Sequence, residues 1–527
     1  MKIYIIILMS FSSLFFTSCE DWLDIQPEGQ TTEDQLFRTG DGYRTVLNGL
    51  YKSMASTSLY GGELGFGVVD CISQQYNLEL LDVNVAFSFT QKCFAAGTFD
   101  YTNVYLASVI ENIWKSAFHI IANANCLLQN AKTASPELFS KGEMERKMIL
   151  GEAYACRALM HFDLVRLFAP APVNDDKKAY VPYVENYPDI HASRISVEPF
   201  LEKVIADLKQ ARELVMEFDT SDLGKGVSAS GKGRFYNEFD PVLPGYNDPS
   251  VEAFFKGRGY RLSYYAITAL LSRVYQYAGK EEEAFEAAKE VMEYTFETRG
   301  AIYDFFSIDD YRGVMETDDF ESKKDVKVIS NLIFAVNNEK AYQDINLRNS
   351  FWKNNRGGIS WLIVNLKAQK TFYTSDGLKD EFDRDYRSRY MIFYPQGDSR
   401  FPVSGKWYIS DNEEVRDKNI TIMPLIRSTE MRYIMAEYYA RKGNFPEAQD
   451  ILTRIRNSRG CTESITVTDW NSFVRELIND ARREWISEGQ LFYLYKRLNA
   501  SVNFGRGEER PLQRSEYLLP IPDDQIL

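Results

Sequence analysis

Two segments of the chain repeat each other at a fixed spacing, and this repeat restricts the fold more than any other feature. The first reads YQYAGKEEEAFEAA and the second YYARKGNFPEAQDI. With a constant offset of 164 residues, four pairs of positions match, namely Tyr275 and Tyr439, Gly279 and Gly443, Glu283 and Glu447, and Ala284 and Ala448. Glycine permits a tight turn, and alanine lets two helices approach closely. The repeat therefore predicts two helix-turn-helix pairs, near 264–295 and 430–457.

Three other stretches predict long amphipathic helices, because their apolar residues recur every three or four positions. They are 109–130, 146–168 and 197–215. The spacing in the repeated segments resembles tetratricopeptide helix pairs, although the long insertions exclude a continuous solenoid. We therefore expect a mainly α fold in which tetratricopeptide-like helix pairs form a scaffold, with loop-rich insertions and a few short strands.

The composition predicts an ordered globular body that does not bind nucleic acid. Hydrophobic residues make up 45% of the 527 positions and aromatic residues 14%, which is enough to bury a large core. The formal net charge is −14, whereas phosphate backbones attract clustered Lys and Arg. After the first 21 residues no apolar run approaches the length that a membrane-spanning helix requires.

The first residues predict a lipoprotein export signal. Lys2 precedes an apolar run, 3–16, which ends shortly before Cys19. The run has about 14 residues, fewer than the ~20 that span a bilayer, so we expect 1–18 to be removed. Cleavage before Cys19 would let that residue carry acyl chains as a membrane anchor. The alternative is an ordinary signal peptide with an incidental cysteine, since Phe16 stands where lipoprotein signals usually have an aliphatic residue.

The remaining residues that could support chemistry show no recognisable site. Besides Cys19, five cysteines and three histidines are spread along the chain without metal-ligand spacing, so we expect no metal and no cofactor. A disulfide between Cys71 and Cys93 is conceivable in an exported protein but not required. Known catalytic motifs are absent, and the glycines of YGGELGFG, 60–67, are expected to form a surface turn rather than a phosphate-binding loop.

Several motifs, in one order along the chain, resemble the SusD/RagB family of outer-membrane nutrient-binding lipoproteins from Bacteroidetes-type bacteria. They run from CEDWLDIQPEGQTTEDQLFRTGDGYRTVLNGLY at the start, through SVEPFLEKVIADLKQA and EMRYIMAEYYARKGNFPEAQDILTRIRNSRG, to ARREWISEGQLFYLYKRLN and YLLPIPDDQI. Gln490 and Leu494 depart from the His and Asp that many members have in the arginine-rich segment. The acidic and basic residues of that segment are expected to stabilise its helix through pairs four residues apart, and these are Arg482, Arg483, Glu484 and Glu488.

The resemblance implies a domain organisation and a set of partners. It divides the mature body, 19–527, into an N-terminal region, 19–215, a loop-rich insertion, 216–260, and a C-terminal region, 261–527, that holds the helix pairs. A lipid on Cys19 would hold the protein at the outer membrane, facing the cell exterior. There it would capture oligosaccharide or peptide for a SusC-like TonB-dependent transporter.

Ligand capture would depend on aromatic faces for sugar rings and on polar side chains for hydroxyl groups. In the central loops the candidates are Trp352, Trp361, Tyr342, Asn346, Arg348 and Asn355. A second candidate surface before the first long helix has Tyr76, Asn77, Phe87 and Tyr101. Each aromatic residue has packing in the core or anchoring of a loop as its alternative role.

The sequence thus predicts a cell-surface protein that binds oligosaccharide or polysaccharide without turnover and is not an enzyme. Three alternatives remain: a RagB-like peptide-capture protein, a glycan-hydrolysing enzyme that uses a carboxylate pair, and an assembly protein without a small ligand. Turnover of a glycan would identify the enzyme. Partner binding without affinity for glycan or peptide would identify the assembly protein.

Overall fold

The computed structural model describes most of the chain after the predicted signal. The described residues are 33–82, 88–189, 191–238, 251–295, 302–303, 311–351, 353, 362–365, 374–375, 379–398, 400–504 and 508–522. Several residues predicted from sequence lie outside them, and these are Cys19, Phe87, Trp352, Asn355 and Trp361. Among the helices within these ranges, none combines the length and apolar character needed to cross a membrane.

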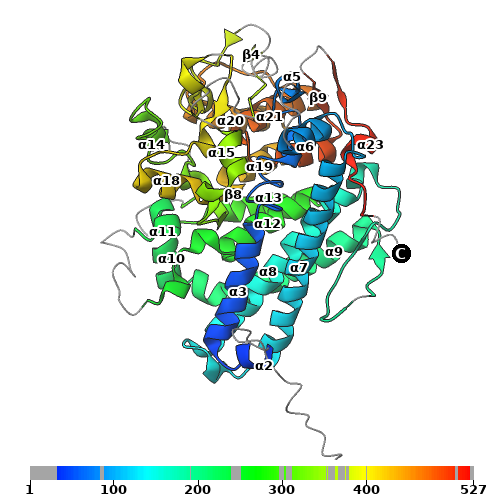
Figure 1. Cartoon of the computed structure of the whole chain (residues 1–527), viewed down its shortest axis with the longest axis vertical. Coiled ribbons are helices and arrows are strands. Elements are labelled where there is room, and N and C mark those ends of the chain that lie inside the picture. The colour runs from blue at the N-terminus through cyan, green and yellow to red at the C-terminus, as the bar shows by residue number, and fades with distance from the viewer. Residues whose placement is uncertain are drawn as a thin grey trace, which may run out of the picture.

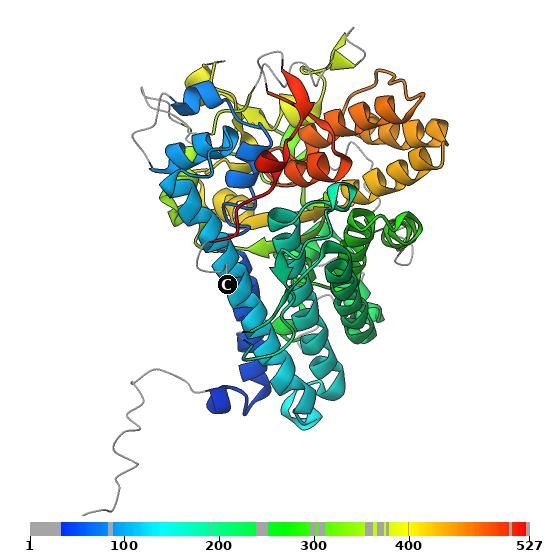
Figure 2. The same ribbon diagram turned by 90° about the vertical axis from the view of Figure 1, so that its right-hand side faces the viewer.

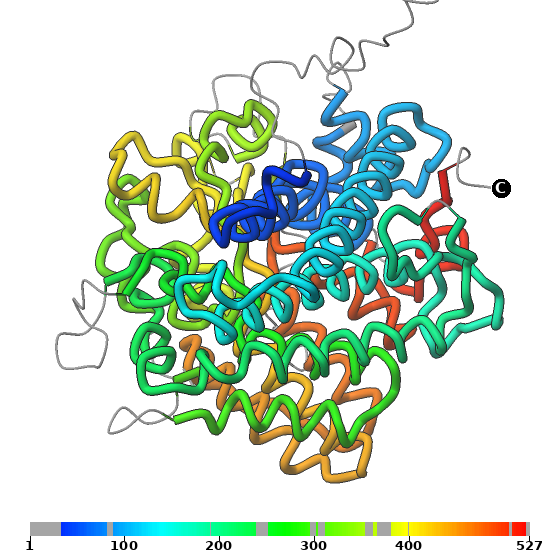
Figure 3. Tube along the Cα trace, turned by 90° about the horizontal axis from the view of Figure 1, so that it is seen from below, coloured from blue at the N-terminus to red at the C-terminus, as the bar shows by residue number. Residues whose placement is uncertain are grey.

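Long helices form one side of the molecule and confirm the three helical stretches predicted from periodicity. They are α7 (Val104–Thr133), α8 (Gly142–Phe168) and α9 (Val197–Asp219), and α3 (Gly40–Met54) packs on both α7 and α8. Figure 3 shows α7, α8 and α9 lying side by side. Because α8 is covered by neighbours, nearly all of its residues from position 148 onward are buried.

The two repeated segments form helix pairs, as predicted. They are α12 (Tyr264–Tyr277) with α13 (Glu281–Met292), and α19 (Ser428–Arg441) with α20 (Phe445–Ser458). Gly279 and Gly443 make the turns with φ of +75° and +77°, a left-handed conformation that favours glycine. The matching alanines, Ala284 and Ala448, are buried where each second helix packs on the first. Figure 2 shows both pairs at one edge of the molecule, where α13 also contacts α19.

Shorter elements complete the mainly α fold (Figure 1). The other helices are α2 (Glu33–Leu36), α4 (Val68–Ile72), α5 (Leu78–Asp82), α6 (Ser88–Gly97), α10 (Asp222–Ser228), α11 (Gly231–Tyr236), α14 (Arg312–Met315), α15 (Ile345–Ser350), α17 (Tyr386–Arg389), α18 (Glu413–Ile420), α21 (Trp470–Glu484), α22 (Leu491–Leu498) and α23 (Arg514–Tyr517). Single turns of 3-10 helix are Pro136–Leu138, Pro172–Asn174, Ala253–Phe255, Arg258–Tyr260, Ile329–Asn331, Ala341–Gln343, Pro395–Gly397 and Gly405–Trp407.

The strands are short and pair two by two, each pair antiparallel. The longest pair joins β3 (Leu332–Asn337) to β8 (Ile422–Arg427), with Leu332 opposite Arg427. The others are β1 (Val181–Pro182) with β2 (Arg194–Ile195), β4 (Thr374–Ser375) with β5 (Lys379–Asp380), β6 (Ile392–Phe393) with β7 (Val403–Ser404), and β9 (Ser501–Asn503) with β10 (Glu509–Pro511). These pairs agree with the few short strands expected from the sequence.

The described part of 216–260, where the sequence predicts a loop-rich insertion, includes regular helices. It contains the end of α9 and the helices α10 and α11. Each short helix begins at a serine whose hydroxyl accepts a backbone hydrogen bond, Ser221 from Gly224 and Ser230 from Gly233. Serine capping of an otherwise unpaired backbone N–H group explains why these glycine-containing segments are helical.

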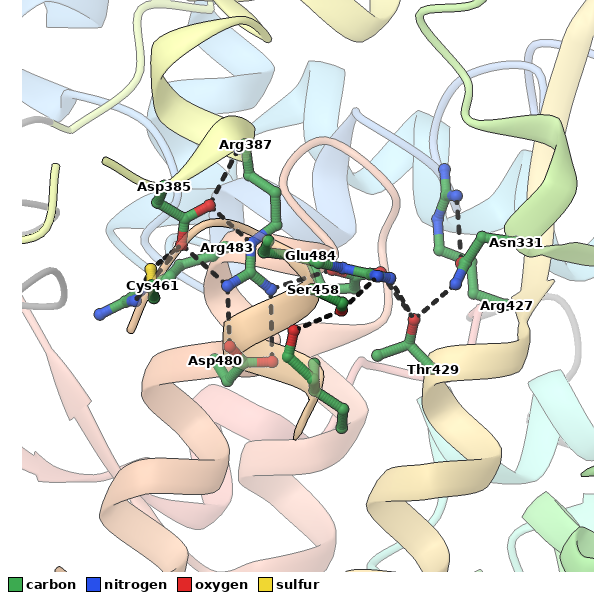
Figure 4. Close-up of polar contacts among 12 residues, drawn as sticks. Asn331, Asp385, Arg387, Arg427, Thr429, Ser458, Cys461, Asp480, Arg483 and Glu484 are labelled. Carbon is green, nitrogen blue, oxygen red and sulfur yellow. Dashed lines mark hydrogen bonds and ion pairs between the residues drawn. The ribbon is translucent and has the colours of Figure 1, made fainter. Parts of the chain in front are cut away.

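A buried cluster of ion pairs centred on Arg387 joins segments that are distant in sequence (Figure 4). The Arg387 guanidinium donates to Asp385 and Asp480 at 2.8 Å and to Glu484 at 2.9 Å. Arg459 donates to Glu484 at 3.1 Å, and all these groups are buried. Burial alone would lower the pKa of Arg387, but the carboxylates of Asp385 and Asp480 raise it well above its ordinary value.

The arginine-rich helix therefore serves a different purpose from the one predicted. Its charged residues were expected to form pairs four residues apart, but Arg483 on α21 contacts Glu381 and Asp385, and Glu488, in the turn after α21, contacts Lys406 and Arg427. Buried charges require partners of opposite sign, and these come from other elements because the helix is surrounded. The segment thus stabilises the tertiary structure.

The turn that follows α21 connects this cluster to the N-terminal part of the chain. The Ser487 carbonyl accepts a hydrogen bond from the Trp407 indole at 2.9 Å, and the Ser487 hydroxyl lies 3.0 Å from the Tyr76 hydroxyl. The Gly489 N–H donates to Asp70 at 3.1 Å. A Cβ atom on Gly489 would come within 1.9 Å of the Leu64 carbonyl. The turn is therefore pressed directly against the segment 64–76.

Replacing Arg387 by alanine should strongly destabilise the fold. The change leaves three buried carboxylates without their common partner, and we expect the free energy of unfolding to fall by about 3–5 kcal/mol. Denaturant unfolding followed by circular dichroism measures this loss. As a matched control, Arg454→Ala removes an exposed partner of Asp450 and should change stability by less than about 1 kcal/mol. Equal losses in the two variants would contradict the role assigned to the cluster.

A buried lysine, Lys327, lies beside the same cluster and has no hydrogen-bond partner among the described residues. Its side chain is fully buried, and the ammonium nitrogen lies 3.3 Å from the centre of the Trp407 ring. Burial lowers the pKa of Lys327 well below its ordinary value; Glu488 opposes this shift, and Lys406 and Arg427 add to it. At pH values between the lowered pKa and the ordinary value of 10.5, the unfolded chain therefore carries a proton on Lys327 that the folded chain lacks.

Replacing Lys327 by methionine should stabilise the protein at neutral pH. The wild-type protein gains stability as pH rises through this interval, whereas the variant has no such proton to lose. We expect the free energy of unfolding at pH 7 to rise by about 1–4 kcal/mol, with a smaller gain at pH 10. Urea unfolding at several pH values measures both effects. The exposed Lys324→Met is the control, and a gain of equal size at every pH would contradict the assignment.

Candidate ligand-binding cavity

A cavity of about 300 Å³ lies between the segment 57–63, α6, the first turns of α7, and α15. Figure 1 shows α6 and α15 at the same level of the molecule. The lining residues are mostly small and polar, and they are Thr57, Ser58, Glu63, Ser88, Phe89, Lys92, Tyr105, Ser108, Val109, Asn112 and Asn346. Four separate parts of the chain thus contribute to one concave surface.

One face of α7 supplies the polar wall of the cavity. Tyr105, Ser108 and Asn112 are spaced by three and four residues, so they share a face of the helix. The helix begins at Asn103, whose side-chain oxygen accepts hydrogen bonds from the N–H groups of Tyr105 and Leu106. Tyr105 is 41% exposed, so its ring is accessible to a ligand.

A buried ion pair between Lys92 and Glu63 forms the floor. Both residues are less than 9% exposed, and the Lys92 ammonium nitrogen also lies 4.5 Å from the centre of the Phe89 ring. Glu63 accepts a second hydrogen bond from the Val68 N–H at 3.3 Å. Burial alone would lower the pKa of Lys92, but Glu63 raises it above its ordinary value.

The glycine-rich segment 60–67 is buried rather than the surface turn expected from its sequence. A Cβ atom on Gly61 would come within 2.2 Å of the Ala55 carbonyl, and one on Gly62 within 2.4 Å of the Thr57 carbonyl. These contacts require glycine because the backbone folds tightly on itself. The segment thereby holds Glu63 in place at the cavity floor.

The structure separates the described candidates into three groups. Asn346 lines the cavity, and Arg348 is exposed on the same helix, α15. Tyr342 is half-buried, with the Arg416 guanidinium 4.6 Å from the centre of its ring. The remaining candidates, Tyr76, Asn77 and Tyr101, have structural contacts within the protein.

These three structural roles follow from hydrogen bonds. Tyr76 is fully buried, and its hydroxyl donates to the Phe66 carbonyl at 2.9 Å. The Asn77 side chain accepts hydrogen bonds from the N–H groups of Glu79 and Leu80 at the start of α5. Tyr101 donates to the Glu516 carbonyl at 2.5 Å. Sequence reasoning instead missed Tyr105 and Asn112, whose signal was a polar face on a helix that is otherwise apolar.

A second cavity, of about 340 Å³, lies between the helix pairs, beside α12, α13 and α19. Its central carboxylate, Glu437, already accepts hydrogen bonds from Gln276, Arg441 and Arg497. Burial alone would raise the pKa of Glu437, but the two arginines lower it. The central carboxylate of this cavity is therefore already engaged by side chains of the protein.

The described residues show no arrangement typical of a metal or redox site. Within this part of the chain, no three His, Cys, Asp or Glu side chains come together as metal ligands would. The five described cysteines, including Cys71 and Cys93, are free thiols. The chemistry available in the first cavity is therefore hydrogen bonding, one ion pair and contact with aromatic rings.

Comparisons with known proteins agree with the sequence motifs. Residues 63–223 match a SusD-like family model described as starch-binding and associating with the outer membrane. SusD-like protein P2 of Formosa agariphila is 28% identical over 214 residues, 40% of this chain and 37% of that protein. SusD-like protein P25 of the same organism is 24% identical over 177 residues, 33% of this chain and 31% of that protein. The chain thus matches about a third of the length of these relatives.

Solved structures show the same fold over nearly the whole chain. A SusD-like carbohydrate-binding protein from Bacteroides vulgatus has a TM-score of 0.62 and 17% identity, covering 92% of this chain and 95% of its own. Surface glycan-binding protein A from Bacteroides fluxus has a TM-score of 0.60 and 16% identity, covering 92% and 96%. The predicted resemblance to SusD-like proteins is therefore confirmed: residues 63–223 match the SusD-like family model, and the fold of solved SusD-like structures extends over 92% of the chain.

Proposed function

We propose that the protein captures an oligosaccharide or polysaccharide in the cavity between α6, α7 and α15, and releases it unchanged. One observation carries this proposal: the exposed ring of Tyr105 lies in the same cavity as several hydroxyl and amide side chains. Two solved proteins of the same fold support it, since one is described as a SusD-like carbohydrate-binding protein and the other as a surface glycan-binding protein.

Binding would combine stacking with hydrogen bonds. The CH face of a sugar ring packs on an aromatic face such as that of Tyr105. Sugar hydroxyl groups lose water on binding and need replacement partners, which Ser108, Asn112 and Asn346 can provide because each can both donate and accept. The helices that position these side chains are rigid parts of the scaffold, so little ordering is needed on binding.

The cavity favours capture over hydrolysis. A glycosidase needs a pair of carboxyl groups flanking the bond to be cleaved. Among the described lining residues, Glu63 is the single carboxylate, and it already pairs with Lys92. The described lining therefore lacks the second carboxyl group that this chemistry needs. A bound glycan would therefore leave intact.

We further propose that a lipid on Cys19 anchors the protein at the outer membrane, facing the cell exterior, where it passes its ligand to a SusC-like TonB-dependent transporter. The predicted signal sequence and the description of the matching family model as associating with the outer membrane support this placement. Peptide capture and ligand-free assembly are the competing outcomes that a binding screen would reveal.

Replacing Tyr105 by alanine should weaken glycan binding without affecting the fold. Loss of one stacking ring should reduce the affinity about tenfold. Because the ring is exposed, the free energy of unfolding should change by less than about 0.5 kcal/mol. Isothermal titration calorimetry against a polysaccharide screen measures the first quantity, and urea unfolding the second.

Tyr187→Ala provides the matched control, because Tyr187 is 37% exposed and does not line the cavity. This variant should bind like the wild-type protein. Unchanged binding in Tyr105→Ala would place the site elsewhere. Binding of peptide pools in preference to every glycan, or of a co-purified barrel alone, would contradict the proposed function.

A further inference from the structure

We infer that the cavity selects neutral saccharides and discriminates against acidic ones, through the ion pair at its floor. This inference rests on the proposed function and concerns the charge of the ligand. Lys92 and Glu63 carry the only formal charges among the described lining residues, and they contact each other directly. All the other described lining residues are uncharged.

The pair is fixed rather than free to separate. Both side chains are nearly buried, with relative side-chain exposures of 9% and 11%. Glu63 is also held by the Val68 N–H, and the neighbouring Gly67 leaves it little room, since a Cβ atom there would lie 2.7 Å from the Glu63 carboxylate. Separating two buried charges is strongly unfavourable, so the carboxylate stays beside the ammonium when a ligand enters.

An acidic sugar would therefore approach an ammonium group, that of Lys92, which already has a carboxylate partner. A uronate or a sulfate ester attracted to Lys92 would have to lie against the Glu63 carboxylate, and like charges at close range repel. No second described cation lines the cavity to compensate. Arg348 is on α15 but, unlike Asn346, is not among the lining residues.

A neutral sugar suits the same pair. A hydroxyl group can accept from the Lys92 ammonium while donating to the Glu63 carboxylate, and charge-assisted hydrogen bonds of this kind are stronger than neutral ones. Ser88, Ser108 and Asn112 offer further uncharged partners around the pair. The floor therefore recognises hydroxyl groups without requiring a charge on the ligand.

The test uses matched pairs of oligosaccharides, one neutral and one carrying uronate or sulfate. Isothermal titration calorimetry at low ionic strength measures the affinity of the mature wild-type protein for each member of a pair. We expect the acidic member to bind at least about tenfold more weakly than its neutral counterpart. In Glu63→Gln, Lys92 is released from its partner, so acidic binding should strengthen about tenfold while neutral binding weakens.

Glu111→Gln is the matched control. It makes the same change in net charge as Glu63→Gln, but at a half-buried residue of α7 that pairs with Lys115 and does not line the cavity. The neutral-to-acidic ratio should therefore stay as in the wild type. If Glu63→Gln does not fold, the ratio of neutral to acidic affinities measured for the wild-type protein still tests the inference. Acidic sugars binding as tightly as neutral ones would overturn the inference and leave capture intact, whereas no binding of either kind would contradict the proposed function itself.

Discussion

The buried ion pairs around Arg387 are the interaction on which the rest of the structure depends. Burying a guanidinium and three carboxylates is costly unless every charge has a partner, and here the partners come from α17, the segment before it, and α21. These charges are therefore all paired in one relative placement of the segments. A hydrophobic contact would tolerate more sliding, because apolar packing has no fixed direction.

That placement determines where the cavity between α6, α7 and α15 forms. The turn after α21 hydrogen-bonds Tyr76 and Asp70, and these residues belong to the segment that follows the glycine-rich turn. The glycine-rich segment 60–67 also holds Glu63 opposite Lys92 of α6. A cavity whose floor and walls are held by helices and buried polar contacts is preorganised, so binding energy is not spent on ordering loops.

The sequence predicted the scaffold better than the site, for a physical reason. Helix periodicity and the turn glycines Gly279 and Gly443 are local signals, and they identified the long helices and both helix pairs. The Arg387 cluster could not be predicted because its partners are distant in sequence. Asp385 and Asp480, for example, lie 95 residues apart. Tyr76 was expected to face a ligand but is core, since a single sequence does not show which aromatic residues are exposed.

Hydrogen exchange with and without a bound neutral oligosaccharide tests the central claim most directly, because it reports the whole surface at once. The account predicts slower exchange at 57–63, in α6, at the start of α7 and in α15, with the helix pairs unchanged. Protection confined to α12, α13 and α19, around the second cavity, would show that the glycan binds between the repeats and would contradict the assigned site.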